Sequence, residues 1–176
     1  ILQFSMGNFN QLALTFAKNT AAGLPAQAGI VAPILHHAGG FDWGGKYNPW
    51  TGLVRHKNWP NKPKTTLSVT HVAGAAMLIS RAVVEKVGSL DERFFLYYED
   101  LDFCLRVQKA GYTIHINPEV VAEHATSASS RPARRTLYQW HSHLQFVTKH
   151  LFRRAYPTAV LIDLLYYPLI FLKSLL

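Results

Sequence analysis

Phe94-Phe95-Leu96-Tyr97-Tyr98-Glu99-Asp100-Leu101-Asp102 is the stretch that decides the fold of this 176-residue chain. Three carboxylates fall within four residues, directly after an aromatic run. Leu101 and Cys104 recur at helical spacing and Gly111 stops the pattern, which predicts a helix that begins at the acids. Acids in a first helical turn are favoured by the helix dipole, and this alone accounts for any one of them. Together with the aromatic wall and with His124 at the end of the next predicted strand, they indicate a functional site.

Several further motifs stand in order along the chain: Val72-Ala73-Gly74-Ala75-Ala76-Met77-Leu78-Ile79-Ser80-Arg81, Val87-Gly88-Ser89-Leu90-Asp91-Glu92-Arg93-Phe94-Phe95, Tyr98-Glu99-Asp100-Leu101-Asp102-Phe103-Cys104-Leu105-Arg106, Ala110-Gly111-Tyr112 and His124. With these motifs the chain resembles the C-terminal half of a family 2 glycosyltransferase, and within it the bacterial rhamnosyltransferase-like branch. The resemblance runs from roughly Gly29 to Leu151. It implies an α/β fold with a GT-A-type mixed sheet flanked by helices.

The resemblance also implies roles for individual residues. Asp100 is expected to be the catalytic base, and His124 a ligand of a divalent metal, Mg²⁺ or Mn²⁺. Glu99 and Asp102 would shape the acceptor pocket or orient Asp100. The other expected substrate-binding residues are Gly74 and Ala75 beside the sugar-nucleotide, and Arg106, which would support the acids through a charge-assisted hydrogen bond.

The N-terminal part predicts an amphipathic helix over residues 9–19 and a short strand over residues 28–35. The strand is apolar on both faces, as in parallel sheets. In the resembled family these elements follow a metal-binding Asp-x-Asp motif, which is not upstream here. Asp100-Leu101-Asp102 has the same letters but belongs to the later acidic motif. We therefore expect the Rossmann-like nucleotide-binding half to be absent and this chain alone to be inactive.

Composition narrows the class of protein and its partners. Apolar residues make up 49% of the chain, which excludes a disordered class, and Cys104 is the only cysteine, which excludes an internal disulfide and suits a reducing compartment. Its helical context makes Cys104 a core residue. The net charge of +8 favours anionic partners such as nucleotide phosphates or lipid head groups. No nucleic-acid-binding motif accompanies the charge, so we expect no nucleic acid.

Residues 36–66 are rich in glycine, proline and asparagine, which predicts a long loop. Trp43, Trp50 and Trp59 in this loop have two interpretations. They stack on sugar rings or close over the donor, or they only hold an irregular loop against the core. The pair His36-His37 carries no metal prediction, because neighbouring side chains diverge.

Between residues 66 and 124 the pattern alternates strands and helices. We expect a strand-like segment over 66–79, a helix capped by Ser80 and ended by Gly88, a strand over 112–116, a turn at Asn117-Pro118 and a strand over 120–124. Gly74, Ala75 and Ala76 are small, which permits close approach of a ligand or close packing of a helix.

The C-terminal third predicts two helices. Leu137, Trp140, Leu144, Val147 and Leu151 give the first an apolar stripe, and its His141 and His143 point in different directions and cannot share one metal. The tail from Pro157 to Leu176 is apolar but interrupted by Asp163 and Pro168, and basic residues precede it. A spanning helix needs about 20 uninterrupted apolar residues. We expect residues 156–176 to lie in the membrane interface, with packing on a missing N-terminal half as the alternative.

These patterns lead to one functional hypothesis and two alternatives. Residues 1–155 are interpreted as the acceptor-side part of an inverting glycosyltransferase. It would transfer a sugar, with rhamnose as a candidate, from a nucleotide-sugar to a hydroxyl of a cell-envelope glycan or lipid-linked acceptor. We expect it in the cytoplasm, peripheral on the inner face of the cell membrane. The alternatives are a non-catalytic, membrane-docked remnant that binds sugar-nucleotide, and a metal-dependent phosphoester hydrolase.

Overall fold

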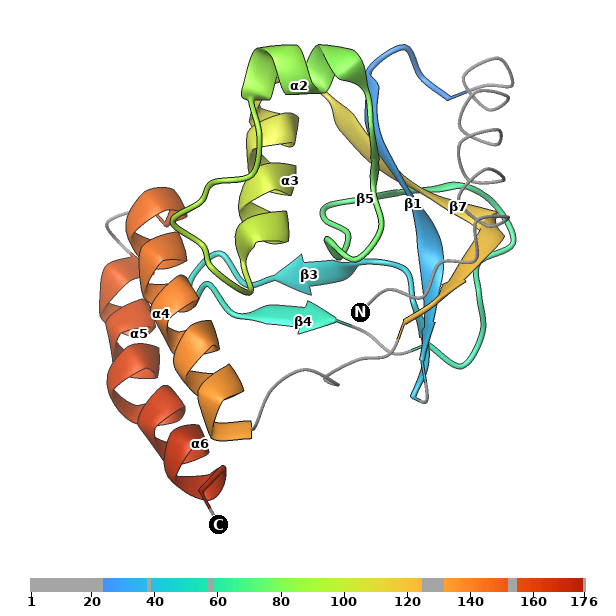
Figure 1. Cartoon of the computed structure of the whole chain (residues 1–176). Helices are drawn as coiled ribbons and strands as arrows, with labels where there is room; N and C mark the ends of the chain where they lie inside the picture. The colour runs from blue at the N-terminus through green and yellow to red at the C-terminus, as the bar shows by residue number, and fades with distance from the viewer. Residues whose placement is uncertain (1–23, 38, 57–58, 125–131, 152–154, 176) are drawn as a thin grey trace.

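A mixed β-sheet forms one side of the molecule, and helices stack away from it in the order α3, α4 and then α5 with α6 (Figure 1). The computed structural model describes residues 24–37, 39–56, 59–124, 132–151 and 155–175. The helix expected over residues 9–19 lies outside these ranges. The predicted α/β class, a mixed sheet flanked by helices, is confirmed.

The sheet is organised around two long parallel strands, β1 (Ala28–His37) and β7 (Thr113–Glu123). The other strands are antiparallel to them: β2 (Gly40–Asp42) and β6 (Leu78–Ile79) pair with β1, and β5 (Leu67–Val69) pairs with β7. Every residue of β1 from position 29 to position 35 is buried. The prediction of a strand that is apolar on both faces is therefore confirmed.

Strand β7 corrects the expected turn at Asn117-Pro118. The chain continues as one strand, and the register with β1 shifts where Pro33 pairs with Asn117 and Ile34 pairs with Val121. The extra residues form a bulge, where proline is tolerated because no ladder hydrogen bond is needed from it. Asn117 supports the bulge, since its Oδ1 accepts a hydrogen bond from Glu119 N at 3.0 Å.

The expected loop over residues 36–66 is also more ordered than its composition predicts. Strand β1 runs on to His37, and β3 (Gly45–Tyr47) pairs with β4 (Val54–His56) as a separate two-stranded sheet. Conversely, the strand-like segment 66–79 is only β5 and β6 at its ends, with a turn-containing loop between them. Short side chains in that loop serve close packing, described below.

Helices α2 (Arg81–Val87) and α3 (Glu99–Lys109) cover the sheet as predicted. Ser80 Oγ accepts from Val83 N at 3.3 Å, and Gly88 ends α2 with a φ of 82°. The core between sheet and helices joins these apolar side chains: Ile30, Ile34, Val83, Phe103, Cys104, Val107, Ile114 and Ile116. Cys104 is fully buried, and burial raises the pKa of its thiol to about 12, so it is a core residue.

Helix α4 (Pro132–His150) packs on α3 through a second core that contains Leu101, Phe146 and Val147. The predicted apolar stripe is partly wrong. Leu137 and Leu144 are exposed, whereas the polar Thr136, Ser142 and His143 are buried. The face of α4 that is buried is thus rotated about the helix axis by about one residue from the predicted apolar stripe: Thr136 and His143 are buried in place of Leu137 and Leu144. The divergence of His141 and His143 is confirmed, since one is exposed and the other has no exposed surface.

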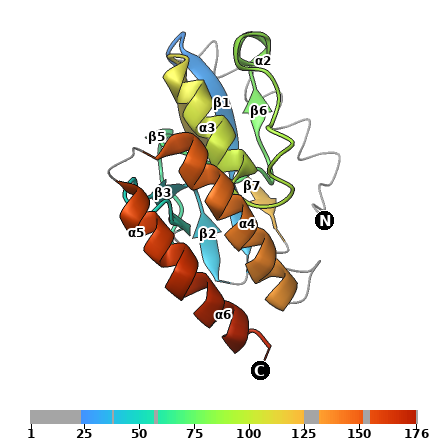
Figure 2. The same ribbon diagram turned by 90° about the vertical axis from the view of Figure 1, so that its left-hand side faces the viewer.

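The C-terminal segment is one continuous helical run that lies beside α4 (Figures 1 and 2). It consists of α5 (Tyr156–Leu161), one π-helical turn, η2 (Ile162–Tyr166), and α6 (Tyr167–Lys173). By length and composition, Tyr156–Lys173 is the one helix in the described part of the chain that is suited to cross a membrane.

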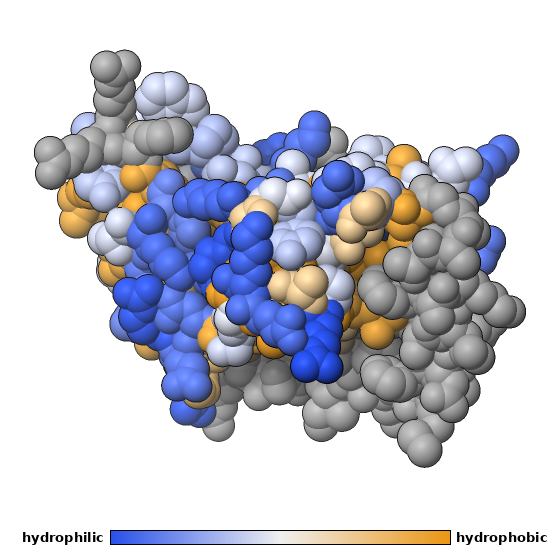
Figure 3. Space-filling view, turned by 90° about the horizontal axis from the view of Figure 1, so that it is seen from above, coloured by the Kyte–Doolittle hydropathy of each residue, from blue (hydrophilic) through white to orange (hydrophobic). Residues whose placement is uncertain are grey.

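The outward side of this run is apolar. Its exposed residues include Val160, Leu161, Leu164, Leu165, Leu169, Leu172 and Leu175, with Leu164 and Leu169 each 65% exposed. By contrast, the face seen from above, over α2, is mainly hydrophilic (Figure 3). The inward side of the run carries Ala159, Asp163 and Tyr167, all buried.

Candidate functional site

The acidic stretch begins α3 through an unusual backbone. Tyr97 and Tyr98 both have positive φ, 68° and 67° respectively, and Glu99 is the first residue of the helix. A left-handed conformation costs a non-glycine residue about 1–2 kcal/mol. The burial of Tyr98 in the core with Leu101 offsets this cost. The two tyrosines therefore turn the chain sharply and place the acids at the rim of the core.

Asp100 and Gly74 lie together in the structure. Asp100 Oδ2 accepts a hydrogen bond from Gly74 N at 2.9 Å, and Oδ1 accepts one from Leu101 N at 2.7 Å. A Cβ atom at position 74 would lie 3.2 Å from Asp100 Cβ. Small size at Gly74 thus lets its backbone approach and orient the carboxylate.

The loop that carries Gly74 also touches the carboxyl ends of the parallel strands. Ala73 and Ala75 pack against a small apolar cluster of Leu35, Ala76 and Ala122, from β1, the loop and β7. The loop therefore lies between Asp100 on one side and the strand ends, where His124 follows β7, on the other. Gly74 and Ala75, which were expected to lie beside the sugar-nucleotide, are part of this loop.

Glu99 lies with Asp100 in a cavity of about 220 Å³. Its Oε2 is buried and has no hydrogen-bond partner in the described part of the chain. Burial, and next the negative charge of Asp100, raise the pKa of Glu99 to about 7. The two neighbouring carboxyl groups therefore differ: Asp100 is fixed by backbone amides, and Glu99 is a carboxyl that changes protonation near neutral pH.

The far wall of this cavity comes from the C-terminal helix, for which the sequence predicts a membrane interface or packing on a missing N-terminal half, and no part in this cavity. Tyr166, Tyr167 and Ile170 line it. The hydroxyls of Tyr98 and Tyr167 lie 3.4 Å apart, and burial is the main cause that raises the pKa of Tyr98 to about 12. No spacing in the sequence connects residues 69 positions apart, so this wall could not be predicted from the pattern.

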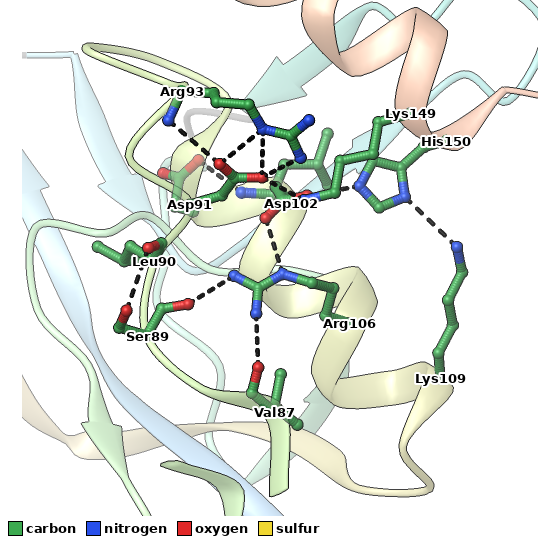
Figure 4. Close-up of polar contacts among 12 residues, drawn as sticks. Val87, Ser89, Leu90, Asp91, Arg93, Asp102, Arg106, Lys109, Lys149 and His150 are labelled. Carbon is green, nitrogen blue, oxygen red and sulfur yellow. Dashed lines mark hydrogen bonds and ion pairs between the residues drawn. The ribbon is translucent and has the colours of Figure 1, made fainter. Parts of the chain in front are cut away.

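Asp102 does not line that cavity. It is fully buried on the other side of α3 and faces α4 (Figure 4). Its Oδ1 accepts hydrogen bonds from Lys149 Nζ and His150 Nε2, both at 2.6 Å, and its Oδ2 accepts from Arg106 Nε at 2.8 Å. Burial alone would raise the pKa of Asp102, but these donors outweigh it and bring the pKa to about 2.

The ion pairs continue from Asp102 into the turn before the aromatic run. Lys149 Nζ also lies 2.6 Å from Asp91 Oδ2, which Arg93 contacts at 2.6 Å (Figure 4). Arg106 donates further to the carbonyls of Val87 and Ser89. Arg106 therefore supports one acid, Asp102, as expected. The cluster as a whole fastens α3 and α4 to the 87–93 turn.

His124 directly follows β7, and its backbone N donates to His36 O at 2.8 Å. Its Nδ1 is buried without a hydrogen-bond partner among the described residues, which is compatible with a metal ligand. Burial is the main cause that lowers the pKa of His124, which favours the neutral ring that ligation requires. No group of three metal-binding side chains is found in the ranges that the structure describes. His124 is thus one fitting ligand and not a complete site.

Two of the three tryptophans have the packing role, and the sugar-stacking role stays a prediction. Trp43 and Trp59 stack on each other with ring centroids 4.6 Å apart, and Trp43 packs against the core. This stacked pair holds its part of the chain against the core. Trp50 is 58% exposed, and its carbonyl accepts a hydrogen bond from Thr158 Oγ1 of α5 at 2.6 Å.

The family model described as glycosyl transferase family group 2 matches residues 56–176, more than half of the chain. The chain belongs to this glycosyltransferase family. The mixed sheet with flanking helices is the GT-A-type arrangement that the resemblance implied. In this glycosyltransferase the matched region holds the Gly74 loop, the Glu99-Asp100 pair, His124 and the C-terminal helix.

Three curated relatives illustrate the similarity. The chain is 40% identical over 55 residues to the low-salt glycan biosynthesis hexosyltransferase Agl10 of Haloferax volcanii, over 31% of this chain and 18% of the relative. It is 31% identical over 85 residues to the N-acetylglucosaminyl-diphospho-decaprenol L-rhamnosyltransferase of Mycobacterium tuberculosis, a match that covers 48% of this chain and 27% of the relative. It is 33% identical over 69 residues to the rhamnosyltransferase WbbL of Escherichia coli, a match that covers 39% of this chain and 26% of the relative. The chain thus matches less than a third of the length of each relative.

Proposed function

We propose that this glycosyltransferase moves a sugar, with inversion at the anomeric carbon, from a nucleotide-sugar to a hydroxyl of a lipid-linked or glycan acceptor of the cell envelope. Rhamnose is the candidate sugar, because relatives named as rhamnosyltransferases are among those similar to the chain. The observation that carries the proposal is Asp100, which two backbone amides hold at a cavity shared with Glu99.

The proposed reaction is a single displacement. The acceptor hydroxyl attacks the anomeric carbon, the bond between that carbon and the diphosphate oxygen breaks, and the hydroxyl proton passes to the carboxylate of Asp100. The amides of Gly74 and Leu101 orient this carboxylate and leave lone pairs free for the proton. Glu99, which is protonated in part near pH 7, holds the acceptor by donating or accepting a hydrogen bond.

A divalent cation, Mg²⁺ or Mn²⁺, would supply charge neutralisation at the departing diphosphate. His124 is the residue of this chain that we assign to it, because of its buried and unpartnered Nδ1. Imidazole nitrogen is an acceptable ligand for Mn²⁺ and a poor one for Mg²⁺, which prefers oxygen. This chemistry favours Mn²⁺ if His124 binds directly.

The C-terminal helix suits attachment to a membrane surface better than a span. Its inward side is packed on α4 and tied to it through His143 and Asp163, 2.7 Å apart, and its outward side is apolar and exposed. A helix fastened in this way to a folded domain lies in the interface with its apolar side toward the acyl chains. We propose residues 1–155 as the acceptor-side part of the GT-A domain and residues 156–176 as this peripheral anchor, at the inner face of the cell membrane.

The test is a matched pair of variants in the full-length protein. Asp100→Asn keeps shape and removes the proton acceptor, so turnover should fall about 10²-fold or more while donor affinity and melting temperature stay close to wild type. Glu92→Gln, a neutralisation at an exposed position of the preceding turn, should leave all three unchanged. A folded Asp100→Asn protein with full activity would refute the assignment. Sugar release with water as the sole acceptor, at the rate of transfer, would instead favour a hydrolase.

A further inference from the structure

Two adjoining cavities form one groove between the start of α4 and the C-terminal helix. The inner cavity is the 220 Å³ space that holds Glu99 and Asp100. The outer cavity, of about 430 Å³, lies toward the first turn of α4 and the end of α6. Tyr97, Gln139 and Ile170 line both, so the two spaces are continuous around these side chains. Both ribbon views place these ends of α4 and α6 side by side (Figures 1 and 2).

The two ends of the groove have opposite charge. The inner end carries the carboxyl groups of Glu99 and Asp100, and the outer end is lined by Arg135 and Lys173. Neither cation forms an ion pair with any residue in the described ranges. This differs from Arg106 and Lys149, whose charges are neutralised by Asp102. The outer cavity is therefore a positively charged space with no protein counter-ion among the described residues.

The basic end of the groove meets the apolar side of the C-terminal helix. Leu172 precedes Lys173 directly and Leu175 follows it by two residues, and these leucines are 59% and 61% exposed. Leu169, one turn earlier, is also exposed. A molecule in the groove thus passes from an acidic end, past aromatic and amide side chains, to a basic end and then to an apolar surface.

We propose that the outer cavity, through Arg135 and Lys173, binds the diphosphate of a lipid-linked acceptor. The acceptor's sugar then reaches Glu99 and Asp100 past Tyr97 and Gln139, and its lipid lies along the outward side of the C-terminal helix. This assignment rests on the proposed transferase function and adds to it the class of acceptor, a lipid diphosphate sugar, and the residues that recognise it.

The chemistry of the two cations supports a diphosphate. Arginine presents a planar pair of donors that matches two phosphate oxygens, and lysine adds a point charge. A neutral glycan gives them no partner. A diphosphate also places its sugar and its lipid on opposite ends, which is the order in which the groove places its polar and apolar surfaces.

The experiment compares two soluble acceptors with the full-length protein: one sugar linked through a diphosphate to a short alkyl chain, and the same sugar linked directly to that chain. The wild type should prefer the diphosphate acceptor. The double variant Arg135→Gln with Lys173→Gln should raise KM for the diphosphate acceptor at least about tenfold, the effect of losing one charged hydrogen bond, with KM for the alkyl acceptor and for the donor unchanged. Arg134→Gln is the matched control, because Arg134 is exposed and contacts Tyr138 instead.

Three results separate the possibilities. An unchanged preference in a folded double variant overturns the groove assignment and leaves the proposed function standing. If the wild type transfers sugar to neither acceptor, the proposed function itself fails. If the double variant loses binding to vesicles of anionic phospholipid but keeps its KM for the soluble diphosphate acceptor, the cations contact membrane head groups and the assignment is wrong.

Discussion

His143 Nδ1 lies 2.7 Å from Asp163 Oδ1, and both side chains are buried between α4 and the C-terminal helix. His143 Nε2 donates to the carbonyl of Thr51 at 2.7 Å, so the ring joins three parts of the chain. Asp163 is the only acid of residues 156–176. Because it turns inward, the charge that interrupts the apolar sequence does not interrupt the apolar surface.

That surface leads to a prediction about membrane binding. Replacing Leu164, Leu165 and Leu169 by serine removes apolar area from the outward side without touching His143 or Asp163. Binding to anionic liposomes, measured by flotation, should fall at least about tenfold, since each buried leucine contributes about 1.5–3 kcal/mol. Val84→Ser on α2, also an exposed apolar residue, should bind like wild type. Equal flotation of all three proteins would contradict the interfacial role.

A second prediction concerns stability. Asp102→Asn leaves Arg106, Lys149 and His150 without their shared carboxylate, and breaking a buried pair costs about 3–5 kcal/mol. The free energy of unfolding in urea at pH 7 should fall by that amount. Glu85→Gln breaks only the exposed pair with Arg81 and should change it by less than about 1 kcal/mol. A fall of similar size in both variants would show that Asp102 has no special structural role.

The pKa of Glu99 gives a third prediction. Its folded-state pKa of about 7 exceeds the ordinary value of 4.5, so the folded protein keeps a proton that the unfolded chain loses. Wild-type stability should therefore decline as pH rises from about 4.5 to 7. Asp100 lies in the same cavity as Glu99, and Tyr98, with its raised pKa, stays neutral throughout this range.

The comparison is with Glu99→Gln, which has no carboxyl to titrate. Its melting temperature should match wild type at pH 4.5 and exceed it at pH 8. Asp100→Asn should shift the window to lower pH, because it removes the neighbouring charge. Parallel stability curves for wild type and Glu99→Gln across this range would disprove the raised pKa.

A fourth prediction separates a metal ligand from a structural histidine. If His124 binds the cation, His124→Ala in the full-length protein should weaken Mn²⁺ binding about 10-fold or more by calorimetry, and added Mn²⁺ should restore part of the activity. His36→Ala is the control, since His36 is a neighbouring strand-end residue that pairs with Glu123. Unchanged Mn²⁺ affinity in His124→Ala would remove His124 from the metal site.

Local patterns predicted the elements that depend on local chemistry. Helix α3 follows from the spacing of Leu101 and Cys104, and α2 follows from Ser80 and Gly88, because caps and periodicity act within a few residues. The pairing of Gly74 with Asp100 was not predicted. It could not be derived from spacing, since 26 residues and a change of element separate them.

The predictions that were wrong concern polar residues whose partners lie far away in the sequence. The stripe on α4 was misplaced because Thr136, Ser142 and His143 are buried, and hydrophobic periodicity assigns polar residues to solvent. The sequence interpretation gave Asp102 the same role as Glu99, in the acceptor pocket or beside Asp100. Its direction was decided by Lys149 and His150 on another helix, which no local pattern contains.

The π-helical turn at Ile162–Tyr166 sets the rotation between the two halves of the C-terminal helix. Each residue in a helix turns the chain by about 100°, so deleting one residue from this turn would rotate every later side chain by that angle about the axis. Tyr167 would lose its contact with Tyr98, and leucines that are now exposed would turn toward the cavity of Glu99 and Asp100. The number of residues in this one turn therefore determines that the same helix presents exposed leucines outward and cavity-lining tyrosines inward.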